Sequence, residues 1–332
     1  MQTIRWGILA PGRISHKFAA ALKVAAGAEL AAVGSRDRER AVAFAAAHGI
    51  PAAHAHGSYE ALAADPSVDA VYIGSPHSGH EAHTLLCLAH GKHVLCEKPL
   101  AVNAAQAERM VAAARAAGLL LMEAVWTRFL PTVARLRELI ADGSLGDVRL
   151  VMADFGFRAP FDPHSRLFAP ELAGGALLDL GIYPLTLASL CCGPPVEIRA
   201  VANRGATGVD EETAMVLRHA RGELATLSCS LRADTPREAH IVGTAGRVRL
   251  LSPWWAGTRL AIQRPDAAEE LLELPSRGGG YAHEAEAFMA LLRAGRTEPD
   301  VMPLDESLAI MRTMDAIRGQ CGVRYPLDGE AS

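Results

Sequence analysis

"TIRWGILAPGRISHKFAAALKVA", residues 3–25, joins an apolar run to a segment of helical periodicity through a short turn. The pattern predicts a strand over 3–9 and a helix over 12–25. The turn has Ala10, Gly12 and Ser15 where a dinucleotide-binding turn has Gly-x-Gly-x-x-Gly. Gly12 remains where backbone comes closest to a pyrophosphate, and the other two residues are small substitutes. An ordinary tight turn is the alternative, so the segments that follow decide between the two.

Strand and helix signals keep alternating through the first third of the chain. Strand-like runs occupy residues 29–35, 68–74, 93–97 and 119–125, and helix-like runs occupy 38–49, 59–65, 80–91 and 103–117. Asp37 is placed to cap the second helix, which ends on Gly49. Near-continuous apolar strands that alternate with helices predict a parallel sheet covered on both faces. We therefore predict a doubly wound α/β Rossmann domain over residues 1–124.

The pattern changes after residue 124. A helix is expected over 128–143, a long strand over 147–157 and a helical stretch from Gly175 to Leu190. Six strand-like runs separated by turns follow (196–204, 213–219, 223–231, 238–244, 246–251 and 258–264), and then helices near 282–294 and 305–319. This order predicts a C-terminal α+β domain over 125–332 with a largely antiparallel open sheet.

Composition excludes several classes of partner. The formal net charge is -4 and the pI about 6.4, so no global basic surface predicts nucleic acid or an anionic membrane as partner. The start of the sequence has no signal-peptide pattern, and no apolar run approaches the roughly 18 residues of a membrane span. The 6 cysteines lie mostly in apolar stretches without metal-like spacing. We expect free thiols and a cytoplasmic protein.

The end of the second strand indicates the cofactor. NAD sites usually place an acid there to bind the ribose 2'-hydroxyl. This chain has Ser35 and Arg36, a hydroxyl and a cation that suit a 2'-phosphate. We predict NADP, with NAD less favoured; the alternative is that Arg36 is a solvated loop charge.

Five motifs carry a family resemblance: "GILAPGRIS" (7–15), "VYIGSPHSGH" (71–80), "VLCEKPLA" (94–101), "GGALLDLGIYP" (174–184) and "GGGYAHEAEAF" (278–288). Over essentially the whole chain they resemble the Gfo/Idh/MocA family of oxidoreductases. "MEAVWTRFLP" (122–131), with Tyr183 where most members have histidine, is similar to the branch of dimeric trans-dihydrodiol and NADP-dependent xylose dehydrogenases.

The resemblance implies a set of catalytic residues. Asp179 and Tyr183 are four apart on an expected helix and so share a face. Tyr183 is the implied proton carrier, Lys98 its charge partner and Asp179 part of the same polar network. A nearby ammonium favours a phenolate, which makes tyrosine a usable base. The alternative for Lys98 alone is a surface strand end.

The resemblance also implies binding residues. For the cofactor they are Ala10, Gly12, Arg13, Ile14, Ser35, Arg36, Ser75, Pro76, His77, His80, Glu97 and Lys98. For the substrate they are Trp126, Arg128, Phe129, Phe155, Arg158 and Tyr281, with a place at the domain interface as the alternative for the first three. His80 is expected to contact the cofactor or to cap the helix that it begins.

Three further features are interpreted without a role in the reaction. His77, His80 and His83 are spaced three apart, but no acidic or cysteine partner lies at metal spacing, so no metal site is predicted. Cys191–Cys192 and Trp254–Trp255 are interpreted as packing features.

We therefore expect an NADP-dependent oxidoreductase that transfers a hydride from a ring CH–OH of a cyclic sugar or vicinal (dihydro)diol to the nicotinamide. The alternatives are an NAD-dependent glycosidase and a non-catalytic sugar or nucleotide sensor on the same fold. The family's usual dimer surface is the exposed face of the C-terminal sheet, so a homodimer is expected. The sequence does not distinguish among an aldose, a polyol and a dihydrodiol as substrate.

Overall fold

A computed structural model describes residues 2–329, which divide into two compact units. Of the described residues, unit 1 comprises 2–129 and Arg277–Ser307, and unit 2 comprises Leu130–Ser276 and 308–329. The C-terminal segment 277–307 thus belongs with the N-terminal sheet, whereas the predicted division at 124/125 placed it in the other domain. The physical reason is apolar packing, since the Phe288 ring lies 5.0 Å from the Trp6 ring.

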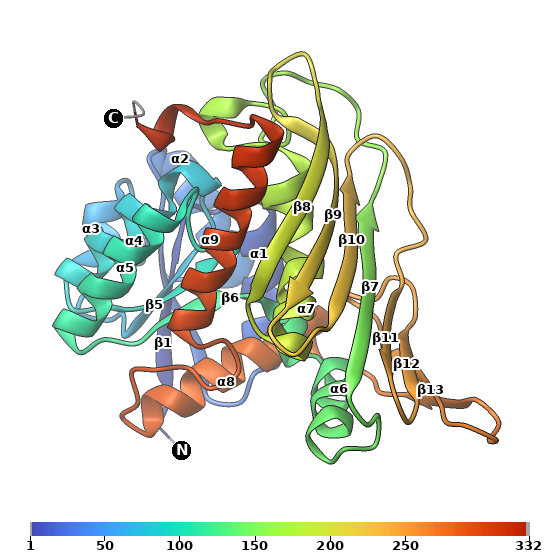
Figure 1. Cartoon of the computed structure of the whole chain (residues 1–332). Helices are drawn as coiled ribbons and strands as arrows, with labels where there is room; N and C mark the ends of the chain where they lie inside the picture. Colours follow the sequence, from blue (N-terminus) through green and yellow to red (C-terminus); the bar gives the residue numbers. More distant parts are fainter. Residues whose placement is uncertain (1, 330–332) are drawn as a thin grey trace. The chain divides into compact units, whose positions relative to one another are not determined.

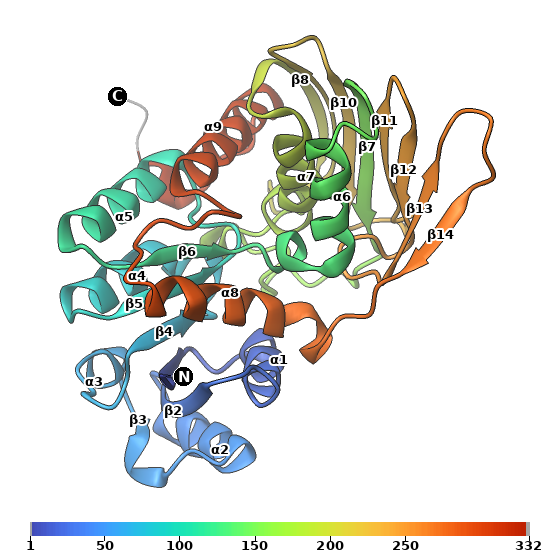
Figure 2. The same ribbon diagram turned by 90° about the horizontal axis from the view of Figure 1, so that it is seen from below.

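Unit 1 is built on a six-stranded sheet of order β3-β2-β1-β4-β5-β6, and every strand pair is parallel. Helices α4 and α5 pack side by side on it (Figure 1), and α8 lies beside α1 (Figure 2). The elements are β1 (Ile4–Leu9), α1 (Arg13–Leu22), β2 (Ala28–Gly34), α2 (Arg38–His48), β3 (Ala55–His56), α3 (Tyr59–Ala63), β4 (Ala70–Ile73), α4 (His80–Ala89), β5 (His93–Glu97), α5 (Ala104–Ala117), β6 (Leu121–Ala124) and α8 (Tyr281–Arg293).

The strand order of unit 1 locates a ligand crevice. The chain reverses direction across the sheet between β1 and β4, and open parallel sheets bind ligands at the carboxyl ends of the strands at such a point. The segments that follow β1, β4 and β5 therefore meet at one edge. They carry the turn at Gly12, the segment from Ser75 to His80, and Lys98.

Unit 2 is built on an eight-stranded sheet of order β14-β13-β12-β11-β7-β10-β9-β8 (Figure 1). Neighbouring strands of this sheet are antiparallel, except for the pair β7 and β10, which is parallel. The elements are α6 (Pro131–Ala141), β7 (Val148–Gly156), α7 (Ile182–Cys192), β8 (Pro195–Arg204), β9 (Asp210–His219), β10 (Leu224–Ser230), β11 (Ala239–Gly243), β12 (Arg247–Leu250), β13 (Arg259–Gln263) and β14 (Glu270–Glu273); α9 (Leu304–Cys321) spans the division between the units. The predicted fold class is confirmed.

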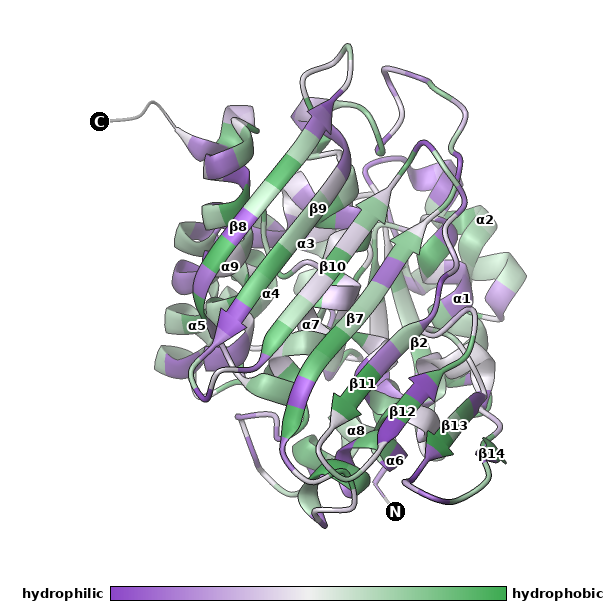
Figure 3. Ribbon diagram, turned by 45° about the vertical axis from the view of Figure 1, so that its right-hand side comes forward, coloured by the Kyte–Doolittle hydropathy of each residue, from purple (hydrophilic) through white to green (hydrophobic). Residues whose placement is uncertain are grey.

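Helix α7 covers one face of this second sheet, and the opposite face is shown in Figure 3. That face carries exposed apolar side chains on neighbouring strands, among them Val201 on β8 (72% exposed), Val216 on β9 and Leu224 on β10. Alternation explains the pattern, because residues that flank them in each strand point to the α7 side.

The stretch Pro170–Cys192 is long and apolar enough to span a membrane by length and composition, which the sequence analysis did not predict. However, 89% of its apolar window is buried inside the chain, as in the core helix of a globular domain. Its apolar character therefore has an explanation in packing.

The predicted ends of α2 are confirmed, whereas α1 ends at Leu22 and α6 begins at Pro131, three residues inside the predicted bounds of 25 and 128. The Asp37 side chain accepts hydrogen bonds from the amides of Glu39 and Arg40, and Gly49 ends α2 with φ +80°. Pro131 opens α6, where its missing N–H leaves no intrahelical bond unmade.

Candidate active site

The turn after β1 leaves the start of α1 open. Gly12 precedes the helix, and no side chain within residues 2–329 caps it. A Cβ added to Gly12 would come no closer than 3.8 Å to another atom, Gly74 O, so the protein itself leaves room there. Free helix N-terminal amides beside an open glycine bind anions such as a pyrophosphate. The residues present therefore fit a dinucleotide at this turn.

Ala10 and Ser15 occupy the other two glycine positions of this turn in different ways. Ala10 has φ +66°, in the left-handed region that costs an L-residue about 1–2 kcal/mol. The buried Ser15 hydroxyl donates to Ala10 O at 2.8 Å and fixes the turn from inside. Arg13 and Ile14 form the first helical turn, and Arg13 is exposed there.

The segment after β2 presents a cation. Arg36 is exposed, and its guanidinium forms no hydrogen bond or ion pair within the described residues. Ser35 is buried, and its Oγ accepts the Asp37 amide at 3.2 Å. The Asp37 carboxylate is occupied as the cap of α2. This edge therefore offers a cation, and the capping bonds of Asp37 hold its carboxylate, through Oδ1, at the start of α2.

His80 links the segments after β4 and β5. Its Nδ1 lies 2.8 Å from Pro99 O and its Nε2 3.0 Å from Ser75 O, and the ring is fully buried. The alternative that His80 caps its own helix is wrong, because both ring nitrogens face carbonyl oxygens outside that helix. Burial lowers the pKa of His80. The ring positions the backbone around Lys98 and is not open to a metal ion.

The other two histidines of the series, His77 and His83, do not join His80 in a cluster either. His83 Nδ1 lies 2.9 Å from Ser75 Oγ, and burial lowers the pKa of His83 to about 4. His77 is buried, with its ring 5.7 Å from that of His80. Pro76 lies between Ser75 and His77 in the same segment.

Lys98 is half-buried directly after β5, and its amide donates to Glu97 Oε2 at 3.2 Å. The other oxygen of the buried Glu97 carboxylate accepts the Tyr72 hydroxyl. Burial, reinforced by Glu97, raises the pKa of Tyr72 well above its usual value. The Glu97 carboxylate therefore holds the Lys98 backbone in place from within unit 1.

Asp179 and Tyr183 lie on one helical stretch of unit 2, but its first part differs from the expected α-helix. Residues Leu177–Gly181 form a π-helical turn, and α7 begins at Ile182. Close packing explains the absence of a side chain at Gly181, where an added Cβ would lie 2.9 Å from Leu177 Cδ1. Such turns recur at functional sites.

Aromatic side chains and an ion pair surround this stretch. The Phe155 ring stacks on Trp255 with 3.3 Å between centroids and lies 5.3 Å from the Tyr183 ring. Arg166 Nη1 donates to Asp179 Oδ1 at 2.9 Å, and the Asp179 side chain is 7% exposed. A hydroxyl-bearing residue thus stands among flat apolar rings beside a charge-compensated carboxylate.

Trp255 was interpreted from the sequence as a packing residue; it does pack, stacked on Phe155, and its ring also lies 6.5 Å from that of Tyr183. The interpretation of Trp254 is confirmed, since it is buried and its Nε1 donates to Asp154 O at 2.7 Å. No sequence signal separates the two tryptophans, because only the path of the chain decides which one faces the rings.

The remaining predicted substrate residues fall into two groups. In unit 1, Trp126 stacks on Tyr281 at 4.5 Å, and the half-buried Phe129 ends the same short helical turn. Arg128 is buried and paired with Glu306, and its Nη1 also donates to Val301 O at 3.0 Å. Both partners belong to unit 1, so the Arg128 guanidinium is held within that unit.

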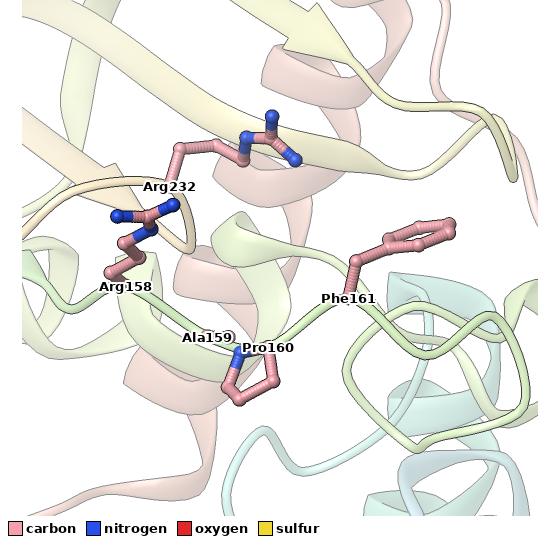
Figure 4. A pocket seen from close by; sticks show the side chains of 5 residues that line it. All are labelled: Arg158, Ala159, Pro160, Phe161 and Arg232. Carbon is pink, nitrogen blue, oxygen red and sulfur yellow. The ribbon is translucent and has the colours of Figure 1, made fainter.

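In unit 2, Arg158 lines an open hollow of about 450 Å³ together with Arg232 and Phe161 (Figure 4). Figure 4 shows the side chains of Arg158 and Arg232 near each other, and Phe161, which also lines the hollow, is 48% exposed. Arg232 also pairs with Glu211 at 3.1 Å, and it was not among the predicted residues.

Two family profiles match the chain. The profile described as "Oxidoreductase family, NAD-binding Rossmann fold" matches residues 4–125, and the "GFO/IDH/MocA C-terminal domain" profile matches residues 133–249. A trans-1,2-dihydrobenzene-1,2-diol dehydrogenase of Homo sapiens is 41% identical over 334 residues, which cover 98% of this chain and 99% of that protein. The protein of the same name from Bos taurus is 41% identical over 335 residues, with the same coverage.

Two solved structures share the fold over nearly the full length. The aldose-aldose oxidoreductase from Caulobacter crescentus, complexed with glycerol, has a TM-score of 0.88 and 27% identity, with 97% of this chain and 98% of that chain covered. A 3-ketoreductase from Actinomadura kijaniata, in complex with NADP and TDP-benzene, has a TM-score of 0.85 and 29% identity, with 96% and 98% covered.

Proposed function

The chain belongs to the Gfo/Idh/MocA family of oxidoreductases, and we propose that it is an NADP-dependent dehydrogenase that oxidises a ring CH–OH of a vicinal (dihydro)diol or a cyclic sugar. It is an NAD(P)-dependent oxidoreductase, as the sequence predicted. The alternatives of a glycosidase and a sensor are not favoured, because the relatives carry dehydrogenase, oxidoreductase and ketoreductase names.

The aromatic group around Tyr183 carries the proposal for the substrate. Phe155 and Trp255 present stacked apolar rings beside the Tyr183 hydroxyl. A ring substrate with one apolar face and vicinal hydroxyls suits such a surface, because flat rings bury area while a hydroxyl fixes orientation. Both a dihydrodiol and a pyranose have this shape. The diol is the first choice, since the dihydrodiol dehydrogenases are the relatives with 41% identity.

Arg36 and Asp37 support NADP over NAD. The Arg36 guanidinium has no partner in the described chain and suits a 2'-phosphate, whereas Asp37 is already used as a helix cap. Gly12 and the open start of α1 would hold the pyrophosphate. When bound, the nicotinamide supplies the acceptor for the hydride.

Proton transfer is assigned to residues of this chain. Tyr183 Oη takes the proton of the substrate hydroxyl as the carbon is oxidised, and Lys98 Nζ stabilises the phenolate. The proposal requires these two atoms to come within hydrogen-bond reach when substrate is bound. Asp179 orients the network, and its pairing with Arg166 compensates a negative charge that would otherwise oppose the phenolate.

A substrate panel tests the function. Purified protein is mixed with NADP⁺ or NAD⁺ and with a trans-dihydrodiol, aldopyranoses or acyclic polyols, and NADPH or NADH formation is measured. We expect NADP⁺ reduction with the dihydrodiol and weaker reduction with pyranoses, and a large loss in Tyr183→Phe. Reduction with acyclic polyols alone would overturn the ring-substrate proposal, and no reduction with any pair would overturn the proposed function.

We also propose a homodimer formed through the exposed face of the unit 2 sheet. Val201, Val216 and Leu224 place apolar surface on three adjacent strands of that face. Val201→Glu should therefore shift the mass measured by light scattering toward the monomer, while Val24→Glu, at an exposed site on unit 1, should not. An unchanged mass in both variants would refute this surface.

A cytoplasmic location is proposed from the thiols. All six cysteines are free, and four of them are buried, whereas proteins of oxidising compartments usually pair their cysteines. Cell fractionation with an antibody to the protein tests this, and recovery outside the cytosolic fraction would contradict it.

A further inference from the structure

Three side chains of unit 1 converge at the edge of its sheet, away from the carboxyl-end segments after β1, β4 and β5. His54 ends the short turn Ala52–His54, His56 lies on the edge strand β3, and Asp65 follows α3. His54 Nδ1 and His56 Nε2 each lie 2.8 Å from Asp65 Oδ2. The three atoms lie within 4.8 Å of one another.

Local backbone geometry explains the convergence. His54 and His56 flank Ala55, which is buried at 1% exposure, so alternation turns both imidazoles to the same outward side. Asp65 Oδ1 accepts hydrogen bonds from the Ser67 amide (2.8 Å) and hydroxyl (2.6 Å). These bonds orient the carboxylate and leave Oδ2 directed at the two rings, as outer partners orient metal ligands.

The donor set suits a transition metal. Two imidazole nitrogens and one carboxylate oxygen form a ligand set of Zn²⁺ and its neighbours, and such sites keep a fourth position for water. Asp65 is 4% exposed and His54 36% exposed, so the cluster is anchored inside and open on one side. His54 Nε2 and His56 Nδ1 have no hydrogen-bond partner in the described chain, so each ring can carry its proton there and offer a lone pair inward.

The positive charge of Lys92 lowers the affinity of this cluster for a cation. Lys92 Nζ donates to the backbone oxygens of Asp65 (2.7 Å) and Val68 (2.8 Å), which places an ammonium behind the carboxylate. This cation disfavours hard ions that depend on carboxylate charge, such as Mg²⁺ or Ca²⁺, more than ions that prefer imidazole.

We propose that His54, His56 and Asp65 bind a divalent transition-metal ion of the Zn²⁺ class. The ion ties the turn before β3 to the end of α3 and so stabilises the edge of the unit 1 sheet. None of its residues belongs to the catalytic or cofactor-binding set, although the Ser35 amide donates to His56 O at 3.1 Å.

Metal titration tests the proposal. Untagged, chelator-treated protein is titrated with Zn²⁺ by calorimetry, with Co²⁺ by visible absorption, and with Mg²⁺ as the hard-ion comparison. We expect one Zn²⁺ per chain, tetrahedral-type Co²⁺ absorption and no Mg²⁺ binding. At free Zn²⁺ about 100 times Kd, the unfolding equilibrium constant should fall about 100-fold, seen as a raised Tm.

Matched variants identify the ligands. His54→Gln and His56→Gln should each weaken Zn²⁺ binding at least about tenfold. His16→Gln is the control, because His16 Nδ1 and His48 Nε2 form another histidine pair at 2.8 Å without a carboxylate. The proposal would be overturned by unchanged Zn²⁺ affinity in both His54→Gln and His56→Gln, or by loss of Zn²⁺ binding in His16→Gln. The three side chains would then be a hydrogen-bonded cluster without a metal. The histidine variants decide this even if Asp65→Asn fails to fold.

Discussion

Arg36→Ala is the sharpest test of cofactor choice. The guanidinium is exposed and has no partner within residues 2–329, so its removal leaves no uncompensated carboxylate in the free protein. The whole effect should therefore appear in binding of the 2'-phosphate. A charge-assisted hydrogen bond contributes about 1.5–3 kcal/mol, which corresponds to a loss of about 10- to 150-fold in NADP affinity. Solvent exposure and salt place the expectation in the lower part of that range.

The assay is the Kd of NADP and of NAD for each variant, measured by quenching of protein fluorescence at physiological ionic strength. Arg38→Ala is the matched control, because Arg38 is an exposed arginine two residues further on whose Nη1 donates only to Ala55 O, at 3.4 Å. Like Arg36→Ala, this variant removes one positive charge near the start of α2. We expect NADP affinity to fall in Arg36→Ala, and NAD affinity to change little in either variant.

Equal losses for NADP and NAD in Arg36→Ala would refute the assignment, because a 2'-phosphate contact cannot act on a cofactor that lacks the phosphate. An equal loss of NADP affinity in Arg38→Ala would reduce the effect to general electrostatics.

Three further predictions concern proton transfer, the aromatic group and a buried acid. Lys98→Met should lower turnover about 10²–10⁴-fold with NADP affinity changed only a few-fold, and Tyr183→Phe should lower turnover by a similar factor. In steady-state kinetics, the double variant should be little slower than either single variant, because the two residues act as a unit. Normal turnover in Lys98→Met would contradict the proposed proton-transfer role of Lys98 and Tyr183. Trp255→Ala should raise the KM of a ring substrate about 2- to 10-fold through the lost ring contact, without a change in NADP Kd, and an unchanged KM would contradict a substrate role. Burial raises the pKa of Glu123 from 4.5 to about 7, so the folded state binds the extra proton and stability falls as pH rises from about 4.5 to 7. Glu123→Gln should flatten that slope in denaturant unfolding and be more stable at pH 8 by up to about 3 kcal/mol, whereas an unchanged slope would show that Glu123 does not titrate there.

The Rossmann half was predictable because its signals are local. Parallel strands covered on both faces are apolar throughout, and the helices between them carry their own start and stop residues, such as Asp37 and Gly49. Once the strand order is known, the segments at Gly12 and Lys98 must meet at the carboxyl edge. The sequence alone therefore places the motif around Glu97 and Lys98 at that edge.

Membership of the last helices was not predictable in the same way. The helix Tyr281–Arg293 has an ordinary amphipathic pattern, which shows that it needs a partner but not which sheet supplies it. The partner is the N-terminal unit, through Phe288 and Trp6, nearly the length of the chain apart. The π-helical turn at Leu177–Gly181 also escaped prediction, since its sequence has the same apolar content as an α-helix.

The sequence by itself determined the fold class, the family and the positions of Lys98, Asp179 and Tyr183, because strand periodicity, helix caps and contiguous motifs are encoded within a few residues of one another. Only the tertiary structure decided that Trp255 faces Phe155 and Tyr183, that Arg166 pairs with Asp179, and that His54, His56 and Asp65 converge. The first two contacts join segments of different elements, so they depend on strand register and loop path, which local patterns do not specify. The third depends on an edge strand of two residues, too short to show a periodicity at all.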